Sequence, residues 1–129
     1  MSTLDHVSAI SLFVEDLHAA KHFYLEVFGV PVIFEDANSV ALRFSGLIVN
    51  LLQVEAAQEI VAPAAVGSRS TGSRFQLSVW VDDVDEVCTA LVARGVQLLN
   101  GPLDRPWRMR TANFVDPAGH SWEVGQRLD

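Results

Sequence analysis

Hydrophobic and polar residues alternate along two short stretches of the chain, and each stretch is followed by apolar residues at helical spacing. The first alternating stretch covers residues 8–14, and the second covers residues 75–81. Alternation with a period of two is typical of a β-strand that has one buried face. Because the same order of patterns occurs twice, the sequence predicts a tandem repeat of one structural unit.

The first half of the chain predicts a strand, a helix and three further strands. Asp16 is placed to cap the helix, and Gly29 followed by Pro31 marks its end. Short polar turns then separate three apolar runs, which is typical of a β-meander. These runs predict strands at about residues 31–35, 39–45 and 47–54.

The second half repeats this order. Asp83 and Glu86 form a capping box at the start of its helix, and Gly95 ends it. A turn is predicted at residues 116–119, where Asp and Pro are followed by Gly. The remaining strands are predicted at about residues 96–100, 108–115 and 121–126.

Between the two halves, residues 56–74 lose the periodicity and are rich in Ala, Ser, Gly and Pro, which predicts a linker. With 129 residues the chain is long enough for one buried domain and too short for two independent ones. We therefore expect a single α+β domain over residues 1–129, made of two βαβββ modules at residues 8–55 and 75–127. A module that cannot bury its own sheet face must pair with its copy, which predicts a curved mixed sheet around a shared cup.

Strand parity indicates which side chains line this cup. Gln76, Ser78 and Trp80 share one face of their strand, while the other face is aliphatic and suits a helix. Burying several polar groups together costs several kcal/mol unless they bond to one another, to water or to a ligand. A wet or occupied pocket is therefore predicted on the face that carries Ser11, Phe13, Asn50, Leu52, Gln76, Ser78, Trp80 and Glu123.

Composition and charge argue against several classes of partner. Sixteen acidic residues against nine basic ones give a net charge of −7, which repels nucleic-acid backbones and anionic membranes. No apolar run approaches the roughly 18 residues of a membrane helix, and the first residues lack a secretory pattern. The lone Cys88 excludes an internal disulfide. We therefore expect a cytoplasmic protein with a small-molecule ligand, and no nucleic-acid or membrane partner.

Several short segments stand out beside the doubled order. They are Val14-Glu15-Asp16-Leu17, Phe23-Tyr24, Phe28-Gly29, Val81-Asp82-Asp83, Arg94-Gly95-Val96 and Asp116-Pro117-Ala118-Gly119-His120-Ser121-Trp122-Glu123. Together these segments resemble the vicinal oxygen chelate superfamily, which groups glyoxalase I, bleomycin-resistance proteins and extradiol dioxygenases. The resemblance covers nearly the whole chain and implies a homodimer. It specifies the fold more closely than the reaction, because the superfamily includes both enzymes and binding proteins.

The resemblance also implies four places at which enzymes of this superfamily hold a divalent metal. Carried onto this sequence, they fall on Ala9, Asn50, Gln76 and Glu123. Of these, Glu123 alone is a typical ligand, and Ala9 offers no donor. We therefore expect no metal and no other cofactor, with a divalent metal as the alternative.

Each candidate residue has a functional and a structural interpretation. Glu123 is a candidate ligand contact, metal ligand or general base, or it only pairs with a neighbour across the sheet. Phe13 and Trp80 form an aromatic clamp with Leu52, or they simply pack where the strands end. Trp107 and Arg110 belong to a basic and aromatic loop that either reaches the ligand or pairs with the abundant acids.

Two functions follow from these candidates. The first is a metal-independent binding protein similar to the bleomycin-resistance group, with Asn50, Gln76 and Glu123 as polar contacts for an amphipathic or cationic compound. The second is a divalent-metal enzyme of the glyoxalase I or extradiol dioxygenase type. Metal-free acid/base chemistry with Glu123 as the catalytic base is a third possibility. The four histidines fall on none of the metal places, and His18 and His22 are expected on a solvated helix face.

Overall fold

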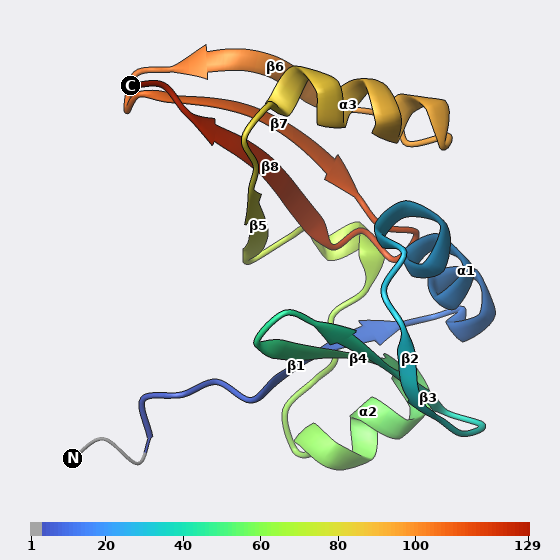
Figure 1. The fold of residues 1–129 in the computed structure, drawn as a ribbon. Helices are drawn as coiled ribbons and strands as arrows, with labels where there is room; N and C mark the ends of the chain where they lie inside the picture. Colours follow the sequence, from blue (N-terminus) through green and yellow to red (C-terminus); the bar gives the residue numbers. More distant parts are fainter. Residues whose placement is uncertain (1–3) are drawn as a thin grey trace. The chain divides into compact units, whose positions relative to one another are not determined.

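The computed structural model describes residues 4–129, which form two compact α+β units. The first unit ends at Ser68 and the second begins at Arg69. The predicted α+β class and the βαβββ order are confirmed in both units, each of which contains its own four-stranded sheet (Figure 1). No helix within residues 4–129 is long and apolar enough to cross a bilayer.

The first unit has the strand order β1-β4-β3-β2, in which β1 runs parallel to β4 and the other pairs are antiparallel. A second helix follows directly after the last strand. The elements are β1 (Ala9–Val14), α1 (Leu17–Phe28), β2 (Val32–Glu35), β3 (Ser39–Phe44), β4 (Leu47–Gln53) and α2 (Val54–Val61).

The second unit repeats this topology with the order β5-β8-β7-β6 and a parallel pair of β5 and β8. It opens with a short 3-10 turn at Arg69–Thr71. The elements are β5 (Gln76–Trp80), α3 (Val84–Ala93), β6 (Asn100–Arg105), β7 (Met109–Val115) and β8 (Ser121–Arg127).

Both long helices begin at the predicted aspartates. Asp16 Oδ1 accepts from the amide of Ala19 at 3.0 Å, and Asp83 Oδ1 accepts from the amide of Glu86 at 3.1 Å. These bonds satisfy amides that a helix start otherwise leaves unpaired. A glutamine at the end of each neighbouring strand does the same for the next free amide. Gln53 accepts from Leu17 N at 3.2 Å, and Gln126 accepts from Val84 N at 2.9 Å.

The core of each unit lies between its long helix and one face of its sheet. In the first unit Ala20, Tyr24 and Val27 of α1 are buried on this side. In the second unit α3 buries Val84, Cys88 and Leu91 and contacts β6, β7 and β8. Burial raises the pKa of the Cys88 thiol, as expected for a cysteine that acts as a small core residue.

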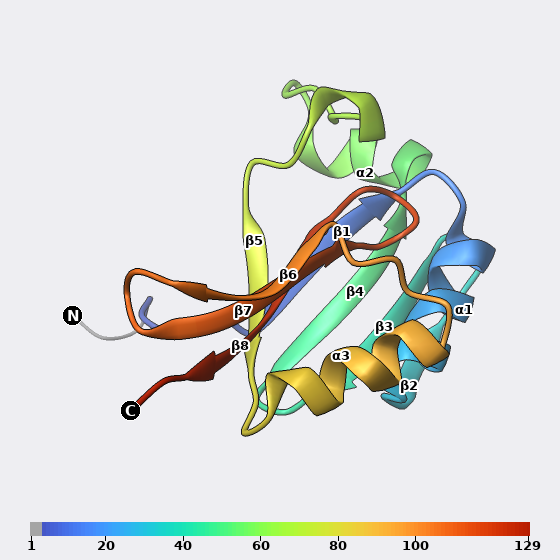
Figure 2. The same cartoon turned by 90° about the horizontal axis from the view of Figure 1, so that it is seen from above.

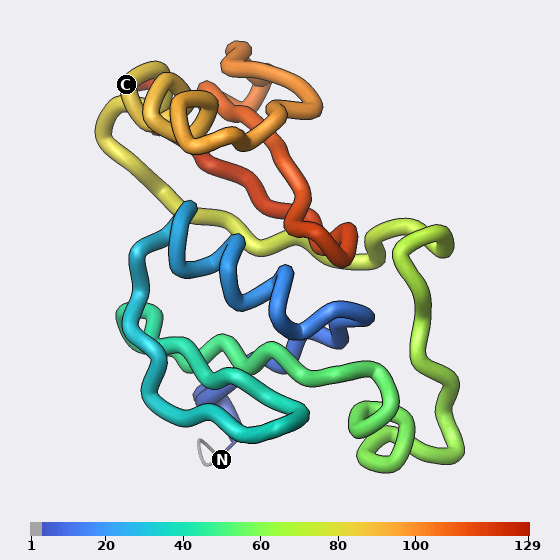
Figure 3. The backbone as a smooth tube through the Cα atoms, turned by 90° about the vertical axis from the view of Figure 1, so that its right-hand side faces the viewer, coloured from blue at the N-terminus to red at the C-terminus, as the bar shows by residue number. Residues whose placement is uncertain are grey.

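The helix α2 was not predicted, because residues 56–74 were assigned to a linker. Val54, Ala57 and Val61 recur at helical spacing, and Ala57 is completely buried. This helix contacts β4 and β1 and coils on the opposite side of the first sheet from α1 (Figure 3). The helix was missed because the segment is rich in alanine and its apolar stripe is only two turns long, so its helical period is weak.

The strand predicted at about residues 96–100 lies instead at Asn100–Arg105. Val96 donates its amide to the carbonyl of Leu91 and is buried, so it completes the end of α3 rather than starting a strand. A Cβ at Gly101 would collide with the Thr111 carbonyl and lie 2.8 Å from Ala112 Cα. The pair Gly101-Pro102 therefore forms an irregularity within an edge strand, beyond the end of the strand predicted at residues 96–100.

Candidate functional site

The open face of the second sheet, away from α3, carries a row of polar side chains. Backbone register places Ser78 of β5 opposite Glu123 of β8, and Glu123 opposite Asn113 of β7. Gln76 lies two residues before Ser78 and therefore points to the same side. We call the four residues Gln76, Ser78, Asn113 and Glu123 the polar face. The prediction that Gln76 and Glu123 share one side of the sheet agrees with this register.

Two hydrogen bonds connect the polar face in pairs. Ser78 Oγ donates to Glu123 Oε1 at 3.0 Å, and Asn113 Nδ2 donates to Gln76 Oε1 at 2.6 Å. Within residues 4–129, Glu123 Oε2 and Gln76 Nε2 have no protein partner. One charged acceptor and one amide donor therefore remain available to a ligand. The ligand role of Gln76, Ser78 and Glu123 stays a prediction.

Sequence analysis missed Asn113. The signal is its position between Ala112 and Phe114, which are fully or almost fully buried against the helix side. Strand alternation places a residue between two such neighbours on the opposite face, and an amide there is a polar residue without a core role. The strand was predicted at residues 108–115, so parity alone would have identified it.

The indole of Trp80 contacts the sheet at the end of this face. Its partner in register is Gly125, and a Cβ at that glycine would lie 2.9 Å from Trp80 Cζ3 and 3.1 Å from Met109 Cε. The absence of a side chain at Gly125 therefore lets the indole approach the strand backbone. Trp80 is still 67% exposed, so most of the ring is available as a stacking surface.

The β6–β7 hairpin, drawn in orange in Figure 2, carries the predicted Trp107 in its turn. Trp107 is 63% exposed, and the guanidinium carbon of Arg105 lies 6.0 Å from the centroid of its ring. Arg105 also donates to Thr111 Oγ1 at 2.9 Å and to Asn100 Oδ1 at 3.1 Å. Register places Thr111 opposite Gly125, on the same side as the polar face. The hairpin cation on this side is therefore Arg105.

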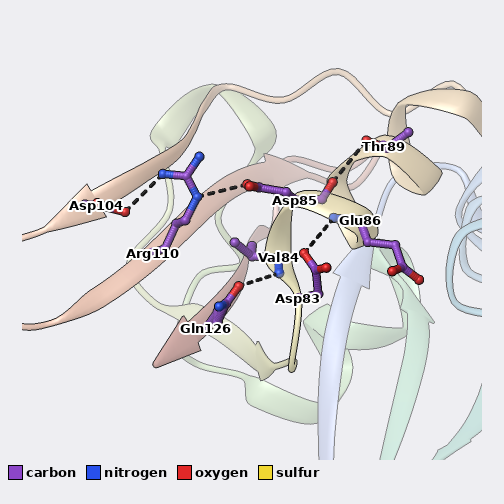
Figure 4. A network of polar contacts seen from close by, with 8 residues as sticks. All are labelled: Asp83, Val84, Asp85, Glu86, Thr89, Asp104, Arg110 and Gln126. Carbon is purple, nitrogen blue, oxygen red and sulfur yellow. Dashed lines mark hydrogen bonds and ion pairs between the residues drawn. The ribbon is translucent and has the colours of Figure 1, made fainter. Parts of the chain in front are cut away.

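Arg110 does not join this group. It lies on the α3 side of β7, where its Nε contacts Asp85 Oδ1 at 2.9 Å and Nη1 contacts Asp104 Oδ1 at 3.0 Å (Figure 4). The hydrogen bond that Arg110 donates to Asp85 raises the pKa of Arg110. Arg110 has the parity of Ala112 and Phe114, and this parity directs it away from Asn113. The interpretation in which this arginine pairs with acids fits the structure, and a contact with a ligand beside Glu123 does not.

The first unit carries a smaller version of the same face. Ser11 lies opposite Asn50, whose Nδ2 is 3.5 Å from Ser11 Oγ, and Ala9 adds no polar group. Phe13 is half-buried and pairs with Leu52, which is only 7% exposed. Because α2 packs against β4 and β1, Leu52 belongs to the core of the first unit and is not open to a ligand.

The donor set does not fit a divalent transition metal. Among residues 4–129 no group of three or more His, Cys, Asp or Glu side chains is arranged to hold a metal ion. The polar face offers one carboxylate, two amides and a hydroxyl, whereas zinc and iron sites use imidazole, thiolate or several carboxylates. His120 does not contribute a ligand beside Glu123, because its Nδ1 lies 2.7 Å from Oδ2 of the buried Asp116. His18 and His22 are exposed on α1.

The chain matches a known protein family. Residues 3–124 match the family model described as the Glyoxalase/Bleomycin resistance protein/Dioxygenase superfamily. The protein YraH of Bacillus subtilis (strain 168) is 32% identical over 123 residues, which cover 92% of this chain and 96% of YraH.

Two solved structures illustrate the range of similar proteins. Lactoylglutathione lyase from Agrobacterium tumefaciens is 26% identical with a TM-score of 0.74, covering 93% of this chain and 92% of the lyase. The antibiotic binding protein TnmS3 from Streptomyces sp. CB03234 is 26% identical with a TM-score of 0.71, covering 97% of this chain and 98% of TnmS3. The same fold thus occurs in an enzyme and in a binding protein.

Proposed function

We propose a small-molecule-binding function, independent of metal, for this chain, which belongs to the glyoxalase/bleomycin resistance protein/dioxygenase superfamily. The observation that carries the proposal is the Oε2 of Glu123, which has no protein partner among residues 4–129 and lies on the same sheet face as the exposed indole of Trp80. A carboxylate with one unbonded oxygen is costly to cover unless the covering molecule brings a donor. The name of TnmS3 as an antibiotic binding protein supports the same class of function.

The chemistry of this face favours a flat compound that carries a positive charge or several donors. Stacking on the Trp80 ring contributes about 0.5–1.5 kcal/mol beyond area burial. A charge-assisted hydrogen bond to Glu123 contributes about 1.5–3 kcal/mol. The net charge of −7 raises the local concentration of cations and disfavours anions. Arg105 is engaged by Thr111 and Asn100, so it does not neutralise Glu123 directly.

A matched pair of probes tests this proposal. 2-Naphthylmethylamine and 2-naphthoic acid share an aromatic body and differ in the sign of their charge. We expect the amine to bind roughly ten-fold or more tightly, as measured by calorimetry, because only the amine donates to Glu123. Trp80→Ala should weaken both probes by roughly five-fold, since it removes the stacking surface that they share.

Glu123→Gln and Glu86→Gln form the matched control pair. Both remove one negative charge, but Glu86 lies on α3, on the other side of the second sheet. Glu123→Gln should abolish the preference for the amine, and Glu86→Gln should leave it intact. Persistence of the preference in Glu123→Gln, or loss of binding on addition of EDTA, contradicts the proposal.

The second candidate is a divalent-metal enzyme of the glyoxalase I or extradiol dioxygenase type, and the family description favours it. The polar face offers one carboxylate and no imidazole or thiolate, so its donor groups do not match those of a zinc site. Elemental analysis that finds about one Fe, Mn, Ni or Zn per chain, lost in Glu123→Ala, would reverse the ranking. Turnover that titrates with a carboxylate and fails in Glu123→Gln would instead assign Glu123 as a catalytic base.

We also propose that the protein is a homodimer, which is what the resemblance to the superfamily implies, and a symmetric pair is the commonest form of a homo-oligomer. Native mass spectrometry of freshly purified protein reports the number of subunits together with any retained compound. A purely monomeric spectrum at micromolar concentration contradicts the dimer and leaves the binding proposal standing.

A further inference from the structure

A cavity of about 430 Å³ lies beside α3 in the second unit, and its lining combines residues of that helix with Leu98, Pro102 of β6 and Arg110 of β7. We propose that this cavity is a second ligand site, for a small uncharged amphipathic molecule. It lies on the α3 side of the sheet, opposite the polar face, and the proposal does not depend on the function proposed for Glu123. Its volume is within the range of small-molecule sites.

Most of the lining is apolar. Cys88 and Val92 are one helical turn apart on α3, and Leu98 and Pro102 face them from the segment that leads into β6 and from β6 itself. Cys88 is 3% exposed, and burial keeps its thiol protonated, so it behaves as an apolar wall. Val92 is 55% exposed and therefore stands at the mouth. A compact hydrocarbon or phenyl group fits such a surface.

The polar part of the lining is built around Arg110. Its Nε and Nη1 are held by Asp85 and Asp104, while Nη2 has no protein partner among residues 4–129 (Figure 4). Asp85 uses Oδ1 for this bond, and its Oδ2 has no partner in the part of the chain that the structure describes. Thr89 donates its hydroxyl to the Asp85 carbonyl at 3.0 Å and retains lone pairs that accept. A ligand head that both accepts and donates hydrogen bonds satisfies these groups.

The charge of this polar part selects an uncharged head. Two carboxylates surround one guanidinium, so Asp85, Asp104 and Arg110 together carry a formal charge of −1. An anionic ligand would meet a guanidinium that is already neutralised and a second carboxylate that repels it. A carboxamide or hydroxyl group accepts from Arg110 Nη2 and donates to Asp85 Oδ2 without this repulsion. The class of ligand is therefore a neutral amide or alcohol with a compact apolar body.

Cys88 provides a built-in probe, because it is the single cysteine of the chain and it lines the cavity. We use benzamide as the neutral probe and benzoate as its isosteric anion. Benzamide at ten times its Kd should slow alkylation of Cys88 by iodoacetamide roughly ten-fold, in proportion to the free fraction of protein. Its Kd is expected to be about millimolar for a ligand of this size. Benzoate should protect much less at equal concentration.

Two variants on α3 give a matched control. Val92→Phe fills the mouth of the cavity, whereas Ala93→Phe adds the same side chain at an exposed neighbour that does not line it. Protection by benzamide, measured against each variant without ligand, should be lost in Val92→Phe and kept in Ala93→Phe. Glu123→Gln should keep it as well, which separates this site from the polar face.

Amide chemical shifts provide the second readout. Benzamide should shift signals of α3, β6 and the Arg110 end of β7, with β5 unchanged. Absence of both protection and shifts at millimolar benzamide overturns the proposal, as does protection that survives Val92→Phe. Shifts confined to β5 and β8 also overturn it, because they place the neutral probe on the polar face.

Discussion

Across the parallel strands of the first unit, Ser11 faces Asn50, and at the corresponding place in the second unit Ser78 faces Glu123. The third strand continues the contrast, because Asn50 has Ala41 as its other neighbour and Glu123 has Asn113. The same backbone register therefore holds a single weak polar pair in one unit and a row of four polar residues in the other.

The residues beside these pairs also differ between the two units. Ala9 corresponds to Gln76 at the start of the first strand of each unit, so a methyl group takes the place of an amide. Leu52 corresponds to Gly125, and α2 covers the first while Trp80 lies over the second. One unit closes its open face with a helix, and the other leaves it exposed to solvent.

The positions that support the helices do not differ. Asp16 and Asp83 cap α1 and α3 with bonds of similar length, and Gln53 and Gln126 reach the next amide from equivalent strand ends. A duplicated unit thus keeps the residues that its own backbone needs and varies the polar residues of its open face. This difference is the physical reason for proposing that the second unit binds the ligand.

The largest expected effect is a difference in stability between variants of the two hairpins that lead into β4 and β8. The first closes with the two residues Ser45 and Gly46, whereas the second closes around the buried Asp116. Asp116 accepts from the amides of Ala118 at 3.0 Å and His120 at 2.8 Å, and from His120 Nδ1. Asp116→Ala leaves these donors unpaired and should lower the free energy of unfolding by about 3 kcal/mol.

Urea denaturation of Asp116→Ala and Ser45→Ala measures this contrast. Ser45 is exposed, so its replacement should change the stability by less than about 0.5 kcal/mol. If Asp116→Ala also stays below about 1 kcal/mol, the buried carboxylate does not organise the second hairpin.

A smaller effect is expected where Leu52 and Gly125 differ. Gly125→Ala places a Cβ against Trp80 and Met109, which should cost about 1–2 kcal/mol and displace the indole. The displaced ring should show a changed indole N–H signal and weaker stacking of 2-naphthylmethylamine. Repeating Gly125→Ala in a Trp80→Ala background provides a double-mutant cycle, in which most of the cost should disappear. An unchanged cost would assign the clash to Met109.

Much of the fold could be predicted from the sequence because its signals are local. The two alternating strands, the aspartate caps and the face shared by Gln76 and Glu123 depend on periods of two and on residues within one turn. The helix α2 and the shift of β6 escaped prediction because both depend on packing. Ala57 becomes a core residue only against β1 and β4, and glycine is required at position 101 because Thr111 and Ala112 lie too close for a Cβ.

The candidate site divides in the same way. Parity placed Ser78 and Trp80 correctly on the open face, yet it could not pair Gln76 with Asn113, since the two residues are 37 positions apart in sequence and lie on strands separated by β8. The basic loop contained both Arg105 and Arg110, and composition did not distinguish them. Their opposite faces follow from the hairpin register, in which Arg105 pairs with Met109 and Arg110 with Asp104.

The smallest effects test whether the helix supports are truly equivalent in the two units. Asp16→Ala and Asp83→Ala should each cost about 1 kcal/mol, because each removes one bond to an otherwise free helix amide. The glutamines should not match. Gln53 accepts from Leu17 N and also donates to the Glu15 carbonyl at 2.6 Å, whereas the Gln126 side chain makes only the bond to Val84 N within the described residues.

Gln53→Ala should therefore destabilise the protein about twice as much as Gln126→Ala, at about 1 kcal/mol per bond. Thermal unfolding of the four alanine variants under one condition gives the comparison. Equal costs for the two glutamines would mean that the bond to Glu15 contributes nothing net. Unequal costs for the two aspartates would show that the first and second units differ in the helix supports as well as on their open faces.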